Sequence, residues 1–138
     1  MYELCLNHAR ADRAMRSLVT DQLSKSRLSI MEWLALNIIA ASPKQGISMS
    51  QIADSLDVTL PQVTALVSTL AKLRFVKQKI LVKDRRGRQV VVTIRGRRTL
   101  LRLESNVTEA MNNWLQDIPK NKAETYIRVV ADLAKSNN

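Results

Sequence analysis

The sequence predicts a mainly helical α+β fold, and three observations support this prediction. Glycine and proline are scarce, with 3 of each in 138 residues, which favours helices over a turn-rich sandwich or barrel. Apolar residues recur at helical spacing over most of the chain, and the spacing becomes extended only after Phe75. Three hydroxyl residues are each followed three positions later by Glu or Gln, which is typical of helix starts. We expect residues 1–138 to form a single domain, because this length supports one core.

The composition excludes several classes of protein. One Cys and one His rule out an internal disulfide and a four-ligand zinc site made by the chain alone, so we expect no metal and no cofactor. No paired carboxylates, Gly-rich phosphate loop or base-activated nucleophile is visible, so we expect no enzyme. No apolar run approaches the roughly 20 residues that span a bilayer. No secretory leader is visible either, so we predict a cytoplasmic protein without a membrane partner.

The positive charge is concentrated in one part of the chain. The formal net charge is +10, yet residues 59–102 alone hold 12 Lys or Arg against one acid, Asp84. The remaining residues hold 10 bases and 11 acids, so they are nearly neutral. Charge of one sign in a short stretch indicates a polyanionic partner, with nucleic acid as the first candidate.

The first half of the chain predicts four helices, over residues 4–23, 29–41, 48–56 and 60–73. The last three begin at Ser29, Ser48 and Thr59, each with Glu or Gln at the position that completes a capping box. Only Asp57 and Val58 separate the two short helices 48–56 and 60–73. Two helices joined by so tight a turn form a helix-turn-helix unit, whose second helix is the recognition helix.

A basic β-hairpin follows the recognition helix. Apolar and Lys residues alternate from Val76 to Lys83, and a β-branched run follows from Val90 to Ile94. The tip between them is Asp84-Arg-Arg-Gly87. We therefore predict a winged helix-turn-helix core over residues 29–95, with a two-stranded β-wing.

Helices at both ends flank this core. Thr93 opens a long helix whose apolar residues run from Leu100 to Leu115, and Pro119 ends it. Asn121 and Glu124 then form another N-cap pair. Because these segments have apolar faces that the core cannot cover, we predict that residues 1–25 and 96–138 are dimerisation helices of a homodimer.

These residues resemble the MarR family of winged-helix bacterial transcription regulators. The most specific part is Asp84-x-Arg86 followed by Val92-Thr93 and Gly96, which is similar to the wing of that family and its closing motif. The resemblance implies an intertwined homodimer that binds double-stranded DNA and represses nearby genes, often until a small ligand or oxidation releases it. Arg74 departs from the family pattern, because a Gly usually follows the recognition helix, and Val92 replaces the usual Leu.

Two groups of residues are our candidates for DNA contact. Those on the recognition helix are Thr59, Pro61, Gln62, Thr64 and Ser68, and those on the wing are Arg85, Arg86 and Arg88. Gln62 can pair with adenine in the major groove, or it can serve only its own capping box. Arginines on a narrow hairpin suit the minor groove of DNA. There are two alternatives: these arginines are a charge run exposed to solvent, or Arg86 forms an ion pair with Asp84 that only shapes the tip.

Four other residues are of a type that can bind a ligand or sense oxidation, namely Cys5, His8, Trp33 and Trp114. One branch of the family senses peroxides through a Cys in the first helix, but Cys5 lacks the local tyrosines of that branch, so we expect a buried, inert thiol. His8 is expected to be half-exposed without a role. Trp33 and Trp114 are expected to anchor the core or an interface.

The sequence therefore predicts a sequence-specific DNA-binding regulator, most simply a homodimeric repressor of a pseudo-palindromic operator with a small-molecule effector. One alternative is a nucleoid- or RNA-associated winged-helix protein without a regulatory ligand. Another is a winged helix that binds only protein, which the charge of residues 59–102 disfavours.

Overall fold

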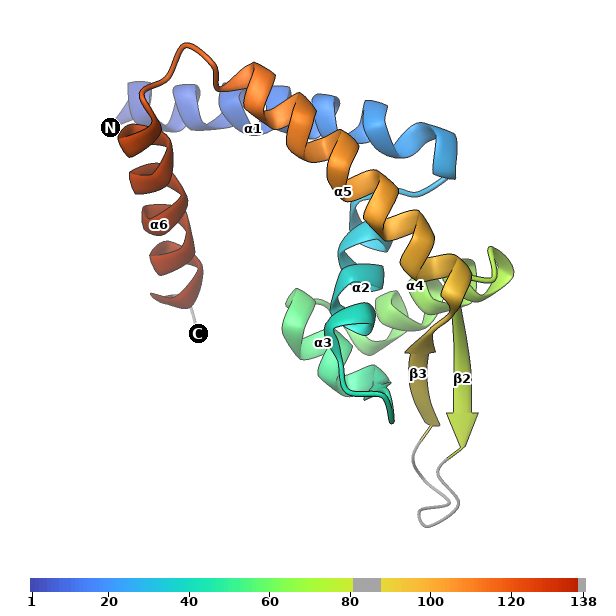
Figure 1. The fold of residues 1–138 in the computed structure, drawn as a ribbon. Helices are drawn as coiled ribbons and strands as arrows, with labels where there is room; N and C mark the ends of the chain where they lie inside the picture. The colour runs from blue at the N-terminus through green and yellow to red at the C-terminus, as the bar shows by residue number, and fades with distance from the viewer. Residues whose placement is uncertain (81–87, 137–138) are drawn as a thin grey trace.

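The computed structural model describes residues 1–80 and 88–136, which form a mainly helical fold with one small antiparallel sheet (Figure 1). The predicted α+β class is confirmed. The elements in chain order are α1 (Tyr2–Leu23), a 3-10 turn η1 (Ser24–Ser26), α2 (Ile30–Ala41), β1 (Ile47–Ser48), α3 (Met49–Leu56), α4 (Leu60–Lys72), β2 (Val76–Ile80), β3 (Arg88–Val92), α5 (Ile94–Trp114) and α6 (Lys120–Ser136).

The predicted capping boxes form and fix the helix starts. The backbone N–H of Ser29 donates to Glu32 Oε2 at 2.8 Å, and the N–H of Glu32 donates back to Ser29 Oγ at 3.2 Å. Ser48 and Gln51 make the same pair at the start of α3, at 3.0 and 3.2 Å. These bonds satisfy donors that a helix start otherwise leaves without a partner, so three helices begin within one residue of the predicted position.

The sheet and the last helix differ from the prediction. The sheet has three strands in the order β1-β3-β2, because the two-residue β1 pairs with β3 through Ile47 opposite Val90 and Ser48 opposite Gln89. A strand of two residues has no periodicity that a sequence could reveal. The last helix begins at Lys120, so Asn121 lies in its first turn and is not its N-cap. The preceding helix, α5, ends at Trp114, before Pro119 is reached.

The core is aliphatic except for Phe75, as the low aromatic content predicts, and it lies where α2, α3, α4 and α5 meet. Leu36, Ile52 and Val67 are fully buried there, and Leu23 at the end of α1 is buried beside them. The apolar stripe of α5 was predicted to face a second subunit. That prediction is wrong for Leu100, Leu103 and Val107, because these side chains are buried in the core of their own chain.

Two long helices connect the core to the far end of the molecule. Helix α5 crosses the front diagonally with α1 behind it, and α6 descends at a distance from the core (Figure 1). Large apolar side chains remain exposed on α6, including Ile127 at 62% and Val130 at 39%. Leu4 on α1 and Trp114 at the end of α5 are also exposed, at 65% and 39%. An apolar surface therefore remains at this end of the single chain.

Arg74 forms the turn that ends the recognition helix. Its φ of 61° is in the left-handed region. The N–H of Arg74 donates to the Ala71 carbonyl and the N–H of Phe75 donates to the Leu70 carbonyl, both at 2.9 Å. This is the Schellman arrangement, in which glycine is preferred because a side chain strains the left-handed backbone. The turn is thus of the ordinary kind, and only the residue that occupies it departs from the family pattern.

We expect Arg74→Gly to raise the free energy of unfolding by up to about 1 kcal/mol, because glycine removes the strain of the positive φ. Thermal unfolding would show this as a rise of about 3 °C. Arg74→Ala is the matched control, because it removes the exposed guanidinium but keeps the strain. Equal stability of the two variants would contradict this explanation.

Candidate nucleic-acid interface

The tight turn between α3 and α4 places the start of the recognition helix at the surface. Asp57 takes a left-handed conformation with φ of 52°, and the N–H of Val58 donates to the Ala53 carbonyl at 3.1 Å. This conformation and this hydrogen bond end α3 without a glycine, because Asp tolerates the left-handed region better than most residues. The chain then turns at once into the N-cap Thr59.

Helix α4 has a buried face and a polar face. Val63, Val67 and Leu70 are fully buried, which attaches the helix to the core. The predicted contact residues are all exposed; they are Thr59, Pro61, Gln62, Thr64 and Ser68. At 100° per residue from the buried face, Pro61 and Ser68 lie near the centre of the exposed face, and Gln62 and Thr64 lie toward its two edges. The sequence prediction that these residues are available for contact is thus consistent with the structure.

Gln62 is engaged in its capping box and keeps part of its hydrogen-bonding capacity. Its Oε1 accepts from the backbone N–H of Thr59 and from the Thr59 hydroxyl, both at 2.9 Å. Its amide nitrogen has no partner among the described residues and carries two N–H donors. Pairing with adenine requires the amide to accept as well as donate, so that contact would compete with the cap. Donation to a base acceptor or a phosphate would leave the cap intact.

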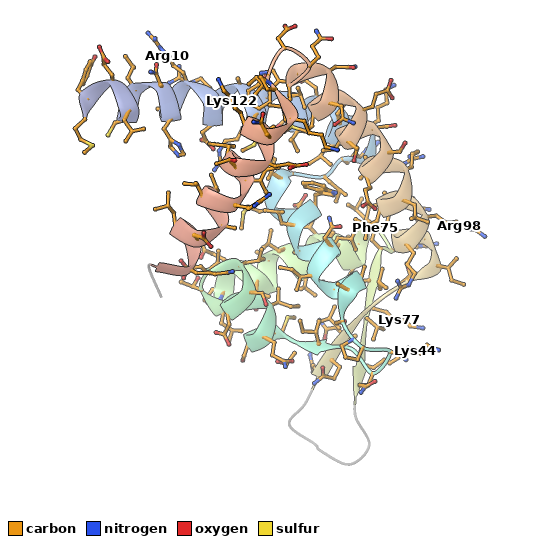
Figure 2. The ribbon with its side chains drawn as sticks, turned by 60° about the vertical axis from the view of Figure 1, so that its left-hand side comes forward. Arg10, Lys44, Phe75, Lys77, Arg98 and Lys122 are labelled. Carbon is orange, nitrogen blue, oxygen red and sulfur yellow. The ribbon has the colours of Figure 1, made fainter. Side chains whose placement is uncertain are left out.

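Most of the described cations of residues 59–102 lie beside the recognition helix and not on it. Helix α4 contains one cation, Lys72, and no acid. Strand β2 carries Lys77 and Lys79, and the first turns of α5 carry several arginines. Lys44, Lys77 and Arg98 lie along one side of the molecule, whereas Arg10 and Lys122 lie at the far end (Figure 2). The lysines of β2 and the arginines at the start of α5 therefore form a cationic flank next to a polar helix whose one charged residue is Lys72.

The fold adds a cation to this flank that sequence reasoning missed. A hollow of about 290 Å³ over the sheet is lined by Lys44 together with Lys77, Lys79 and Arg97. Lys44 lies in the loop before β1, outside the basic stretch of the sequence. Only the pairing of β1 with β3 brings that loop to the sheet, so no local pattern could have indicated it.

The predicted wing residues are described only in part. Arg88 begins β3, is exposed, and pairs with Ile80 across the hairpin. Arg85 and Arg86 lie outside the described residues, so their predicted contacts remain predictions.

The other singled-out residues form no site together. Cys5 is exposed in the single chain, so the prediction of a buried thiol is wrong, because α1 extends past the core at its N-terminal end. His8 is exposed on the same helix. Trp33 packs against the core, and its buried indole N–H has no acceptor in the described parts of the chain. Trp114 is 39% exposed at the end of α5.

Residues 1–80 and 88–136 contain no group of three or more His, Cys, Asp or Glu placed to hold a metal ion. Their helices include none that is both long and apolar enough to span a bilayer.

Residues 28–87 match the model of the MarR family, which covers the helix-turn-helix and the predicted wing tip. Over these residues the chain is similar to the MarR family. The sequence resemblance and the fold therefore agree, and the similarity of fold extends to both terminal helices, as solved structures show.

Three solved structures share the fold at low sequence identity. A MarR-family regulator of Streptomyces coelicolor, Sco3205, solved in complex with DNA, has a TM-score of 0.87 at 17% identity, covering 98% of this chain and 86% of that one. A MarR-family regulator of Rhodococcus sp. RHA1 has a TM-score of 0.84 at 18% identity, covering 96% and 92%. CouR of Rhodococcus jostii RHA1, bound to p-coumaroyl-CoA, has a TM-score of 0.78 at 20% identity, covering 91% and 87%. A comparison with curated protein sequences finds no match.

Replacing Gln62 and Arg88 separately should distinguish base reading from phosphate contact. On a duplex selected from a random pool, we expect Gln62→Ala to cost roughly 1–3 kcal/mol at one base pair and to relax the preference there. Arg88→Ala should weaken binding to all duplexes and reduce the salt dependence by about 0.9 log units for a lost phosphate contact. Fluorescence anisotropy at three salt concentrations measures both effects.

The control for Gln62→Ala is its thermal stability, because loss of the cap alone costs about 1 kcal/mol. Equal losses of affinity on selected and scrambled duplexes would show that Gln62 reads no base. An unchanged salt slope in Arg88→Ala would show that Arg88 touches no phosphate.

Proposed function

We propose that this MarR-type protein is a cytoplasmic, sequence-specific regulator of transcription that represses genes by binding a pseudo-palindromic DNA operator as a homodimer. The observation that carries this proposal is the exposed polar face of α4 beside a cationic flank. Uncharged polar side chains suit the edges of bases in the major groove, and cations suit the phosphates on either side. Binding of this kind hinders polymerase access, which is the basis of repression.

The polar face also favours a sequence-specific regulator over a nucleoid- or RNA-associated protein. A protein that binds without sequence preference gains affinity from cations at the surface that meets the backbone. The exposed face of α4 instead presents the uncharged residues Pro61, Gln62, Thr64 and Ser68, and its one cation, Lys72, lies in the last turn. The same surface shows no arrangement of a nucleophile with a base, which supports a binding function without catalysis.

The proposed homodimer is supported by the exposed apolar surface at the ends of the chain. Helix α6 exposes Tyr126, Ile127 and Val130, and α1 exposes Leu4. Large exposed apolar patches on a folded chain mark interaction sites, and a second copy brings the same patch to a two-fold axis. Two recognition helices related by that axis read two half-sites, which explains why we expect a pseudo-palindrome.

Selection of bound duplexes from a random pool, followed by footprinting, tests the proposed specificity. We expect two related half-sites whose centres lie about one helical turn apart, or a multiple of it. We also expect the same site near the promoter of the gene for this protein. Equal affinity for the selected duplex, a scrambled duplex and an RNA hairpin at the same salt concentration would favour the nucleoid- or RNA-associated alternative.

Sedimentation at micromolar concentration tests the homodimer. We expect a species of twice the 15.6 kDa chain mass. Val130→Glu should shift the equilibrium toward monomer, because it places a charge in the apolar surface of α6. Lys122→Glu is the matched control on the same helix and should leave the dimer intact. A folded monomer in the unmodified protein would contradict the proposal.

A further inference from the structure

Two hollows on one side of the molecule are lined by many basic residues. The larger, of about 720 Å³, lies between the turn from α1 to α2, the first half of α5 and the turn that follows α4. The smaller is the hollow of about 290 Å³ over the sheet. Five cations line the first hollow and four line the second, and no acid lines either; they are Lys25, Arg27, Arg95, Arg98 and Arg102, and then Lys44, Lys77, Lys79 and Arg97. We call these nine residues the cationic band.

The two hollows meet along the first turns of α5. Arg97 lines the smaller hollow, and its neighbour Arg98 lines the larger one. Arg95, Arg98 and Arg102 are spaced at i, i+3 and i+7, which places them on one face of the helix over roughly 10 Å. In Figure 2 Lys77 and Arg98 lie on the same side of the molecule, with α6 on the opposite side. The band therefore runs as one surface from the sheet to the turn before α2.

The cations of the band are available to an external partner. All nine residues are exposed, and within the described parts of the chain none of them takes part in a salt bridge. Like charges held close together repel one another, and a partner that carries negative charge along its whole length would remove that cost. A small anion would meet only the few cations around it. An extended polyanion accounts for the length of the band and for its distribution over four segments of the chain.

The position of the band relative to α4 indicates which polyanion it meets. The backbone N–H of Thr93 donates to the Phe75 carbonyl at 2.9 Å, so the start of α5 is attached to the turn that ends the recognition helix. The band therefore begins beside α4 and leads away from it along α5. It also lies opposite α6, whose exposed apolar side chains we assign to the homodimer. In such a dimer the two bands lie on the outer sides, where the ends of a bound operator emerge.

We propose that the cationic band binds the backbone of the DNA that flanks the operator, and that each protomer thereby bends its flank toward the turn between α1 and α2. This inference rests on the proposed function and adds a second contact region to it. Because the band leads away from α4, a straight duplex that α4 reads would leave its far end, at Lys25 and Arg102, without a phosphate. A bend toward the protein brings phosphates to these cations, and flexible pyrimidine–purine steps in the flanks lower the cost of bending.

Binding of the full-length protein to duplexes of two lengths tests this surface. Both duplexes carry the selected operator; the short one ends at the half-sites, and the long one extends about one helical turn, roughly 10 bp, beyond each of them. We expect the long duplex to bind about tenfold more tightly or better at low salt, with a salt slope that is steeper by about 0.9 log units for each added phosphate contact. Energy transfer between dyes at the two ends of the long duplex should rise on binding, because the bend brings the ends closer.

Charge reversal on α5 should remove these effects. In Arg98→Glu/Arg102→Glu we expect neither the gain from length nor the bend, and a much smaller change in the affinity for the short duplex. Arg10→Glu/Lys122→Glu is the matched control, because it makes the same change in net charge at two exposed cations at the far end of the molecule (Figure 2). An equal loss in this control would show that net charge, and not the band, produces the gain.

A second variant keeps the test open if the first one unfolds, since Arg102 Nη2 donates to Ser26 Oγ at 3.3 Å. Arg98→Gln/Lys25→Gln leaves that hydrogen bond in place. It should still reduce the added salt slope, because two cations of the band lose their charge. A normal thermal unfolding curve is required of each variant.

Several results would overturn the inference. These are equal affinity and equal salt slope on the short and the long duplex, or an unchanged gain from length in both variants of the band. Removal of the gain by millimolar sodium phosphate at constant ionic strength would show a site for free phosphate. A complex of one dimer with two short duplexes would show that the band holds a second duplex.

A scrambled duplex of each length separates this inference from the proposed function. A preference for the selected short duplex over the scrambled one, without a gain from length, would reject the band and leave the proposed regulator standing. A gain from length that is equal on selected and scrambled duplexes, without any preference between them, would support the band as a DNA surface and reject the sequence-specific regulator.

Discussion

The recognition helix, the sheet and α5 meet at Thr93, and their relative placement depends on hydrogen bonds of this residue. Its backbone N–H donates to the Phe75 carbonyl at 2.9 Å, and its hydroxyl lies 2.8 Å from the Arg74 carbonyl oxygen. The same hydroxyl accepts from the N–H of Gly96 at 3.0 Å and so caps α5. Gly96 lies so close to Phe75 that a Cβ there would overlap its carbonyl oxygen. The start of α5 is therefore fixed against the end of α4.

This constraint explains where the cationic flank lies. Because α5 begins at the α4–β2 turn, its first arginines fall beside the lysines of β2 and form the cationic flank. The same geometry brings Arg95, Arg98 and Arg102 to the turn between α1 and α2, where they line a cavity. The position of the charge next to the recognition helix therefore follows from the start of α5.

Local signals predict most of this fold, and pairing at a distance accounts for what they miss. The capping boxes at Ser29 and Ser48 act within four residues, so the sequence shows them directly. Strand β1 exists only because β3 lies beside it, and its two residues have no pattern of their own. The same reason explains the error on the apolar stripe of α5. Periodicity shows that Leu103 packs against another apolar surface, but it cannot show whether that surface belongs to a second subunit or to the same chain. In the candidate site, the polar face of α4 follows from spacing, whereas Lys44 joins the flank through β1 alone.

The separation of polar and charged groups has a physical consequence for recognition. A cation at the centre of α4 would be attracted to the phosphates of every duplex, which raises affinity for all sequences together. Side chains such as Thr64 and Ser68 gain little from phosphate charge, so their contacts depend on the base edges they meet. In the proposed function, charge on β2 and α5 would add affinity beside α4 without changing the base preference of that helix. Affinity and selectivity would then belong to different elements, so that a loss of charge on the flank would lower the affinity and leave the selectivity unchanged.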